Sequence, residues 1–333
     1  MSDEVRTVSN YRFSDLPKIV DSAEEYRYCD DIWVVTCYFN SPGYQTKFNN
    51  FLKFESNFRK AGINLVTIEC AFGNSDFALY ESPNTLRIRS QDVMWQKERL
   101  INVAIAKLPQ YVRKVAWVDC DILFSNPNWL VETSKLLEKY PVVQPFQTAI
   151  RLPQGCDRYC GQGEIWESFG YAINNAQDAI FKGDFQLHGH TGFAWAAQRN
   201  VVENNGLYDA FLSGSGDHFM AHAMCGDFVS YCYDNLPMSE QHKSHFLKWA
   251  KQFHCDVRGR VGWLPGEVLH LWHGDRVNRN YTQRAVELAN FDFDPLLDLV
   301  TGNNGAWQWK SNKPRLHNWA LEYFYQRKED GDT

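Results

Sequence analysis

Residues 32–68 contain the pattern that most restricts the fold of this chain. Residues 32–39 form an almost unbroken run of β-branched, aromatic and other apolar side chains, typical of a strand buried on both faces. Apolar residues then recur at helical spacing over 44–60, and residues 63–68 form a second apolar run. This order predicts a βαβ unit with parallel strands. The chain is therefore expected to have an α/β fold with a Rossmann-like, mostly parallel central sheet flanked by helices.

The same alternation continues along the rest of the chain. We expect helices over 93–107 and 314–327, a helix–turn–helix within 199–224, and strands over 114–118, 190–197 and 267–272. Residues 151–187 are rich in Gly, Gln and charge, and are expected to form a binding loop or lid. The predicted organisation is a polar lead-in (1–30), one domain (31–300, with halves 31–125 and 188–300) and a helical C-terminal tail (301–333).

Composition limits the classes of partner. The net charge of −6 argues against a general nucleic-acid-binding surface. Basic residues do cluster between 243 and 284, either as a solvated surface or as a wall facing an anionic ligand such as a diphosphate. The 12 Trp residues are expected mainly in the core, and the alternative is that some rings line a groove that binds sugars.

The cysteine pattern and the hydropathy of the chain indicate the cellular compartment in which the protein is expected. The 9 cysteines form no C-x-x-C pair, and Cys156 and Cys160 have no second pair nearby, so neither a zinc site nor a disulfide framework is expected there. Residues 1–28 lack the apolar segment of a signal peptide, and no apolar stretch is long enough to span a membrane. These features predict a cytoplasmic protein.

Two carboxylates follow the strand expected at 114–118. Asp119 and Asp121 flank Cys120 and would lie at the carboxyl end of a parallel strand, where ligands bind in open α/β sheets. Hard cations such as Mn²⁺ or Mg²⁺ bind carboxylate and phosphate oxygens. This D-x-D motif therefore predicts a divalent metal beside the phosphates of a nucleotide, and the alternative is a solvated acidic turn.

A late pair of histidines offers further metal ligands. His270 and His273 lie in or just after the strand expected at 267–272. Because neighbouring residues of a strand alternate between faces, only one of them is expected to reach the metal unless the strand has ended.

A glycine-rich turn precedes a third aspartate. Asp217 follows Ser213-Gly214-Ser215-Gly216 and opens an apparent helix. It is either a helix N-cap or a general base that takes the proton of an acceptor hydroxyl in inverting sugar transfer.

Six motifs follow one another within residues 32–280. They are Trp95-Gln96-Lys97-Glu98-Arg99-Leu100-Ile101-Asn102, Ala116-Trp117-Val118-Asp119-Cys120-Asp121, Gly192-Phe193-Ala194-Trp195-Ala196, Asn205-Gly206-Leu207-Tyr208-Asp209, Gly214-Ser215-Gly216-Asp217 and Leu269-His270-Leu271-Trp272-His273. In this order they resemble motifs of the GT-A fold glycosyltransferases, in particular the β-1,4-galactosyltransferase and chondroitin N-acetylgalactosaminyltransferase type. The family counterparts are F-N-R-A-K-L-L-N, the D-x-D strand, G-G-V-S-A, N-G-F, G-G-E-D and H-L-W-H. Gly216 departs from the pattern, since the family has an acidic residue there.

The resemblance implies a single catalytic domain that binds Mn²⁺ and a UDP-sugar and transfers the sugar with inversion to a carbohydrate or other hydroxyl acceptor. It implies that Asp121 binds the metal directly and that Asp119 lies nearer the nucleotide but can also reach the metal. It implies His273, in preference to His270, as a further metal ligand. Asp217 would be the general base. Matching positions that would bind the donor are Asp119, Lys97, Arg99, Asn102, Gly192 and Trp195. Lys97 and Arg99 are two residues apart on a helix, so at most one is expected to affect nucleotide affinity.

Two other functions remain open. A phage-type transferase that glycosylates a modified base in DNA would use the basic segment 243–284. A non-catalytic sugar-binding module would keep the fold without turnover. Intact Asp119, Asp121, Asp217 and a late histidine favour an enzyme.

Overall fold

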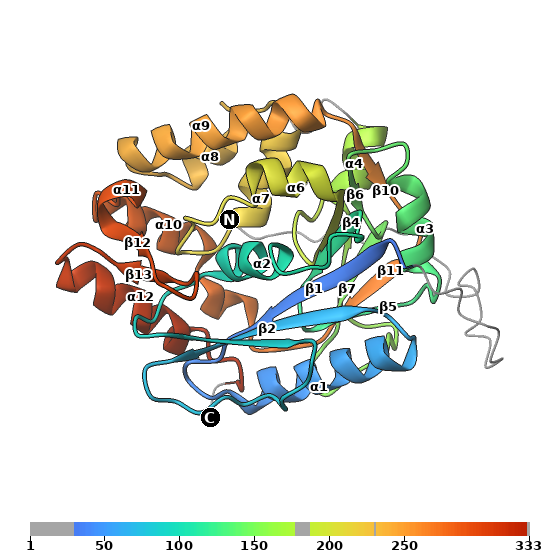
Figure 1. Cartoon of the computed structure of the whole chain (residues 1–333), viewed down its shortest axis with the longest axis horizontal. Helices are drawn as coiled ribbons and strands as arrows, with labels where there is room; N and C mark the ends of the chain where they lie inside the picture. The colour runs from blue at the N-terminus through green and yellow to red at the C-terminus, as the bar shows by residue number, and fades with distance from the viewer. Residues whose placement is uncertain (1–29, 177–186, 230, 332–333) are drawn as a thin grey trace.

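The computed structural model describes residues 30–176, 187–229 and 231–331. The predicted lead-in therefore lies outside the described residues, apart from Asp30. A central sheet crosses the molecule with helices on both sides (Figure 1). Its spatial order is β10 (Val261–Trp263), β6 (Val142–Gln144), β9 (Ala194–Gln198), β4 (Lys114–Val118), β1 (Ile32–Tyr38), β2 (Leu65–Phe72) and β3 (Thr85–Ser90).

Most neighbouring strands of this sheet are parallel. β4, β1, β2 and β3 run in one direction, and β10 is parallel to β6. β9 runs antiparallel to both β4 and β6. The predicted α/β fold with a mostly parallel central sheet is confirmed.

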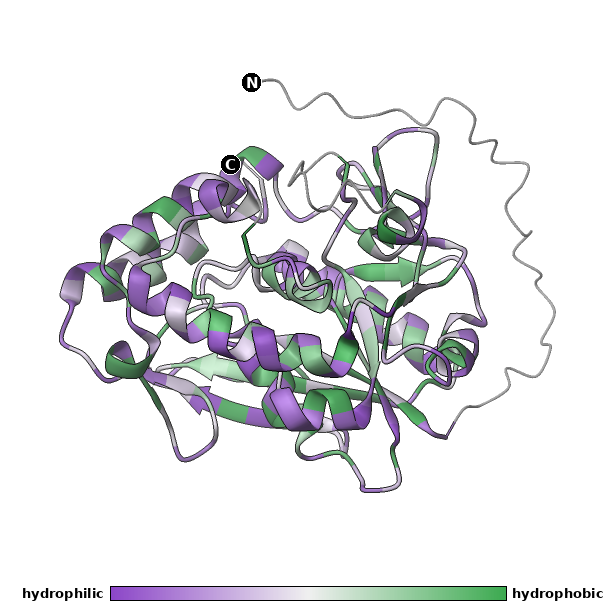
Figure 2. Ribbon diagram, turned by 90° about the horizontal axis from the view of Figure 1, so that it is seen from above, coloured by the Kyte–Doolittle hydropathy of each residue, from purple (hydrophilic) through white to green (hydrophobic). Residues whose placement is uncertain are grey.

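Alternate residues of β1 show how helices cover both faces. Ile32 and Val34 lie in one core cluster with Phe54 of α1 (Gln45–Lys60), whereas Val35 lies in another with Leu100 of α2 (Lys97–Ile105). Burial on both faces explains the unbroken apolar run. In Figure 2 the surrounding helices carry hydrophilic and hydrophobic bands, as expected for helices with one face on a core.

The remaining helices complete the body. They are α3 (Trp129–Leu136), α4 (Phe169–Asn175), α6 (Arg199–Asn205), α7 (Gly216–Met224), α8 (Tyr231–Asn235), α9 (Glu240–Val257), the 3₁₀ helix η2 (Arg276–Arg279), α10 (Tyr281–Asn290), α11 (Pro295–Asp298) and α12 (Pro314–Gln326). The described helices include none with the length and apolar character needed to cross a bilayer. Free thiols are found at Cys37, Cys70, Cys120, Cys156, Cys160, Cys225 and Cys255.

A second, smaller sheet was not predicted. It has the order β5 (Ile122–Phe124), β11 (Glu267–His270), β7 (Thr148–Arg151) and β8 (Glu164–Glu167). The prediction that 151–187 is an irregular lid was wrong for β8 and α4, and residues 177–186 of that segment lie outside the described residues. Pairing with β7 stabilises β8, whose mixed sequence alone carries a weak strand signal.

The C-terminal tail packs against the body. β12 (Leu299–Thr301) pairs with β13 (Trp307–Trp309), and α12 follows. Phe324 of α12 contacts Phe39 and Phe72, which follow or end strands of the central sheet. The tail therefore brings residues 327–330 close to the ends of the central strands.

Candidate functional site

Asp119 and Asp121 follow β4 at its carboxyl end, as predicted. Their side chains join different groups, because the chain leaves the central sheet here and enters β5 of the smaller sheet at Ile122. Asp119 forms an ion pair with Lys97 at the start of α2. Asp121 lies beside His270, the last residue of β11, and His273, which follows that strand. The D-x-D motif therefore links two clusters.

The first cluster is centred on Lys97. Its Nζ lies 2.7 Å from Asp119 Oδ1 and 2.8 Å from Asp217 Oδ2, so one buried ammonium group bridges two carboxylates. The two acids raise the pKa of Lys97 well above its usual range, although burial opposes them. Burial raises the pKa of Asp217, against the effect of Lys97. Asp217 is not the N-cap of α7, which is Ser215, so the N-cap interpretation was wrong.

Glu98 adds a buried carboxyl next to this cluster. Burial raises the pKa of Glu98 to about 8; Lys97 opposes the shift, and Asp217 adds to it. A Cβ on Gly216 would lie 2.7 Å from Glu98 Oε1, so the absence of a side chain at Gly216 makes room for this carboxyl.

The second cluster contains Asp121, His270 and His273. One ligand atom from each lies within 4.8 Å of the others. His273 Nε2 is 3.1 Å from Asp121 Oδ2 and 3.0 Å from His270 Nε2. The expectation that only one histidine reaches the site was wrong, because β11 ends at His270 and strand alternation no longer applies to His273.

This donor set fits a divalent cation. Asp121 Oδ1 is enclosed and has no hydrogen-bond partner among the described residues. Burial, together with the charge of Asp119, raises the pKa of Asp121 to about 7. A carboxylate oxygen with two imidazole nitrogens suits Mn²⁺ better than Mg²⁺, which prefers an all-oxygen shell. Asp119 is held by Lys97 and is not part of this group.

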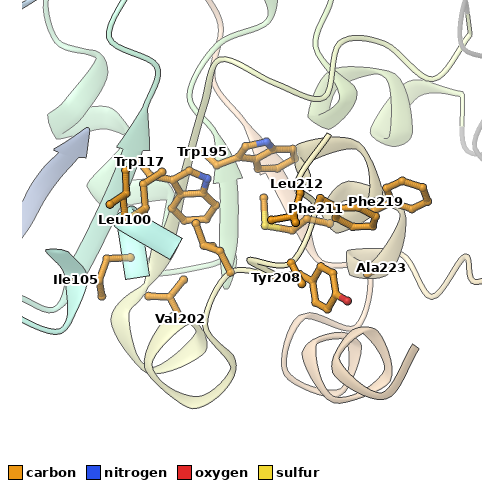
Figure 3. Close-up of a cluster of buried hydrophobic side chains, with 14 of the residues drawn as sticks. Leu100, Ile105, Trp117, Trp195, Val202, Tyr208, Phe211, Leu212, Phe219 and Ala223 are labelled. Atoms are coloured by element: carbon orange, nitrogen blue, oxygen red, sulfur yellow. The ribbon is translucent and has the colours of Figure 1, made fainter. Parts of the chain in front are cut away.

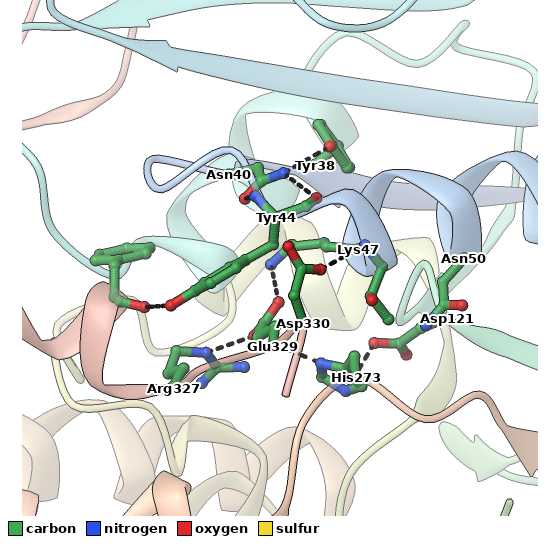
Figure 4. A network of polar contacts seen from close by, with 12 residues as sticks. Tyr38, Asn40, Tyr44, Lys47, Asn50, Asp121, His273, Arg327, Glu329 and Asp330 are labelled. Atoms are coloured by element: carbon green, nitrogen blue, oxygen red, sulfur yellow. Dashed lines mark hydrogen bonds and ion pairs between the residues drawn. The ribbon is translucent and has the colours of Figure 1, made fainter. Parts of the chain in front are cut away.

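Sequence reasoning missed Glu329, which supports His273 from behind (Figure 4). Its Oε1 is 3.4 Å from His273 Nδ1 and 2.6 Å from Arg327 Nε, and Lys47 lies on the same carboxylate. A carboxylate behind a ligating histidine orients the ring and increases its basicity. Glu329 is far along the chain and in no motif, so only the packing of the tail reveals it.

Gly192 and Phe193 connect the two clusters. Phe193 has a left-handed backbone with φ of 78°, and its carbonyl accepts a hydrogen bond from the Asp119 amide at 2.7 Å. Its ring stacks between His190 and His270, at centroid distances of 3.9 and 4.6 Å. A Cβ on Gly192 would lie 3.5 Å from Asp217 Oδ2, so the missing side chain leaves space beside that carboxylate.

Arginines surround the second cluster. Arg279 Nη2 donates to the His273 carbonyl oxygen at 2.6 Å, and Arg151 lies 3.0 Å from His190 Nε2. Burial acts to raise the pKa of Tyr281, which is 42% exposed, yet nearby guanidinium groups lower it to about 7. The groups responsible are those of Arg151, Arg279, Arg284 and Arg327. This concentration of positive charge suits an anionic ligand.

Three predicted donor-binding residues lie elsewhere. Trp195 has 0% exposure and packs in the core near Trp117 (Figure 3), so the prediction that it binds a donor was wrong. Asn102 bonds the backbone of Leu207. Arg99 bonds Asp209 and Gly305. Neither side chain is bonded to Asp119, Asp121 or Asp217, whereas Lys97 and Gly192 are in the site.

Two surface hollows contain none of the clustered residues. The larger, of about 1240 Å³, is lined by residues that include Arg99, Tyr208 and Trp249. A smaller one on α9 is lined by Lys243, Lys248 and Lys251. The basic segment 243–284 is thus divided: these lysines line a separate surface, and Arg279 lies at His273.

Comparison with known proteins gives distant structural matches. No protein-family model and no curated protein matches the chain. The catalytic domain of Drosophila β1,4-galactosyltransferase 7 with xylobiose matches at 13% identity and a TM-score of 0.29, over 57% of this chain and 58% of that chain. A mutant of that enzyme, complexed with manganese, UDP-Gal and xylobiose, matches at 14% and 0.30, over 57% and 59%. The 4-diphosphocytidyl-2C-methyl-D-erythritol synthase of Anaerococcus prevotii matches at 10% and 0.30, over 71% and 87%.

The matched region spans less than two thirds of both galactosyltransferase chains. Structural similarity this low does not identify the function of the chain.

Proposed function

We propose that this chain is a metal-dependent glycosyltransferase of the GT-A type, which moves a sugar from a UDP-sugar to an acceptor hydroxyl with inversion. The observation that carries the proposal is the convergence of Asp121, His270 and His273 at the end of β4, beside the Lys97 cluster. Polar residues gathered at the carboxyl ends of parallel strands form the usual ligand site of such sheets.

Asp121, His270 and His273 would hold the cation, which we propose is Mn²⁺. When bound, such an ion neutralises charge on the departing diphosphate as a Lewis acid. Glu329 keeps the His273 ring in place through Nδ1. Arg279 and Arg151 add positive charge on the same side, so the phosphates would lie between these guanidinium groups and Asp121.

Asp119 and Lys97 would position the nucleotide and the base. Lys97 is shared between Asp119 and Asp217 and therefore fixes the direction of both carboxylates. The Phe193 carbonyl holds the Asp119 backbone. A rigid arrangement of this kind keeps reacting groups in a productive geometry.

Asp217 would act as general base. The acceptor oxygen bonds to the anomeric carbon as the bond from that carbon to the diphosphate oxygen breaks, and the acceptor proton passes to Asp217. Burial raises the pKa of Asp217, which makes it a stronger base than an exposed carboxylate. The space that Gly192 leaves beside Asp217 would admit the acceptor.

The other two functions have less support. The lysines of α9, on which a DNA acceptor would depend, line a hollow that contains none of the clustered residues. A non-catalytic sugar-binding module would have no use for a buried base held by Lys97. Strongly salt-dependent binding to DNA would favour the first, and metal binding without turnover the second.

The test is release of UDP from a panel of UDP-sugars, with Mn²⁺ and with or without hydroxyl acceptors. Asp121→Asn should abolish Mn²⁺-dependent release while the fold is kept, because an amide does not offset cationic charge. Asp157→Asn is the matched control, since Asp157 is exposed and pairs only with Lys53 among the described residues. Near wild-type release by Asp121→Asn, or no release by wild type with any donor, would refute the proposal.

A further inference from the structure

A second group of histidines lies in the interior, separate from the Asp121 cluster. His218 and His222 are four residues apart on one face of α7, and His188 lies on the segment before β9. One ring nitrogen from each lies within 4.8 Å of the others, and all three residues are buried. The ring centroids are 4.6 to 5.2 Å apart. Three imidazoles therefore meet at one point.

Hydrogen bonds orient two of these rings. His222 Nδ1 is 2.7 Å from Asp227 Oδ2, and His188 Nδ1 is 2.8 Å from the Gly189 carbonyl. Asp227 is itself fixed, since its amide donates to the His222 carbonyl and its carbonyl accepts from Tyr233. Metal-ligating histidines characteristically have a carboxylate or backbone carbonyl on the other ring nitrogen, which sets the tautomer and the ring direction.

We propose that His188, His218 and His222 bind a Zn²⁺ ion that stabilises the fold, with Asp227 as the carboxylate behind His222 and with a fourth ligand that is not a His, Cys, Asp or Glu among the described residues. Imidazole nitrogens suit zinc, whereas the carboxylate-containing Asp121 cluster suits a harder ion. Nitrogens bound to one tetrahedral zinc at about 2.0–2.1 Å lie about 3.4 Å apart, so small side-chain rotations would close this group on an ion.

The site would join two segments that carry groups of the Lys97 cluster. α7 bears Asp217 in its first turn, next to His218. The segment that begins at His188 leads to Gly192, where a Cβ would meet Asp217, and to Phe193, whose carbonyl accepts a hydrogen bond from the Asp119 amide. A zinc ion would fix these segments relative to each other. The inference does not depend on the proposed function, because it concerns a metal held for stability.

The test measures zinc bound to the purified chain. The Asp121 cluster is first disabled by His270→Ala with His273→Ala, so that it does not contribute zinc. After dialysis against buffered, submicromolar Zn²⁺, elemental analysis should find one zinc per chain in this double variant. Zinc should also raise its thermal midpoint. Absence of bound zinc would overturn the proposal without any change to the proposed site.

Two further variants in the same background locate the ion. His222→Gln should remove the zinc, and His242→Gln should retain it, because His242 is equally buried but packs against Phe211 and Phe293. Equal zinc in both would refute the assignment. X-ray absorption at the zinc edge of the double variant needs no change in the site, and should show three imidazoles at about 2.0–2.1 Å. A sulfur ligand, or fewer imidazoles, would overturn the proposal.

Discussion

Glu98 should make the stability of this protein fall with rising pH. Glu98 is 4% exposed, and burial raises the pKa of its carboxyl to about 8 from an ordinary value of about 4.5. The folded chain therefore binds a proton that the unfolded chain has released between these two values. The free energy of unfolding consequently decreases across this window. At 1.36 kcal/mol per pH unit, and with the folded carboxyl half ionised at pH 8, the loss between pH 6 and pH 8 is about 2 kcal/mol.

Glu98→Gln should remove this contribution to the pH dependence, because an amide is close in shape to the protonated acid and does not ionise. Urea unfolding, followed by tryptophan fluorescence at pH 6 and pH 9, measures the effect. Relative to wild type, the variant should gain about 3 kcal/mol between the two pH values. An unchanged difference would show that Glu98 is ionised in the fold and that this account of its burial is wrong.

Glu329 is the matched control, since it is also buried but the pKa of its carboxyl is shifted in the opposite direction. Burial acts to raise its pKa, yet Lys47, Arg327 and His273 hold that pKa well below its usual range. Its stabilisation is present above the unfolded pKa and is lost only as the pH falls through the folded pKa. Glu329→Gln should therefore destabilise the fold by the same amount at pH 6 and pH 9.

Four further variants test the site. Lys97→Met should lower UDP affinity in calorimetry. Arg99→Met should leave UDP affinity near wild type and cost about 1–3 kcal/mol in urea unfolding, because the half-buried Asp209 then keeps only Asn102 as a side-chain partner among the described residues. Asp217→Asn should slow transfer by about 10²- to 10⁴-fold with donor affinity unchanged, and near wild-type transfer would place the base elsewhere. Phe193→Ala should weaken Mn²⁺ binding by about 10- to 100-fold, as loss of a group that supports a ligand does, and unchanged binding would contradict its support of His270.

Local patterns were enough to predict β1, β2, β4 and β9 of the central sheet, but not β3, β6 and β10. The run from residue 32 to 39 and the helix that follows specify a βαβ unit, because burial on both faces imposes continuous apolar sequence. The smaller sheet was not predictable in the same way. β5 and β8 contain three and four residues, and they form because β11 and β7 offer partners. Such strands depend on tertiary contacts more than on their own sequence.

The site was predictable where chemistry and strand ends coincide. Asp119, Asp121 and the late histidines were found from their residue types and positions. The pairing of these residues was not predictable, since Lys97 meets Asp119 and Asp217 only when α2 and α7 pack together. His188 and Glu329 were missed because each acts with residues far from it in sequence, and a lone residue of either type carries no signal.

Gly216 shows how a departure from a family pattern can be compensated in space. The family motif has an acidic residue at this position. In this chain the carboxyl of Glu98 from α2 occupies the space that a side chain at position 216 would need.

Gly216 does not have a positive φ, so alanine could adopt its backbone, and only the contact with Glu98 opposes a side chain. Gly216→Ala should therefore cost about 1–3 kcal/mol, as overpacking does. In a Glu98→Ala background the same change should cost nothing or stabilise the helix by up to about 1 kcal/mol. A double-mutant cycle by urea unfolding should give a coupling of 1–3 kcal/mol, within the ~0.5–3 kcal/mol range of residues in contact. If the two changes are additive, the two residues do not compete for this space, and the compensation does not exist.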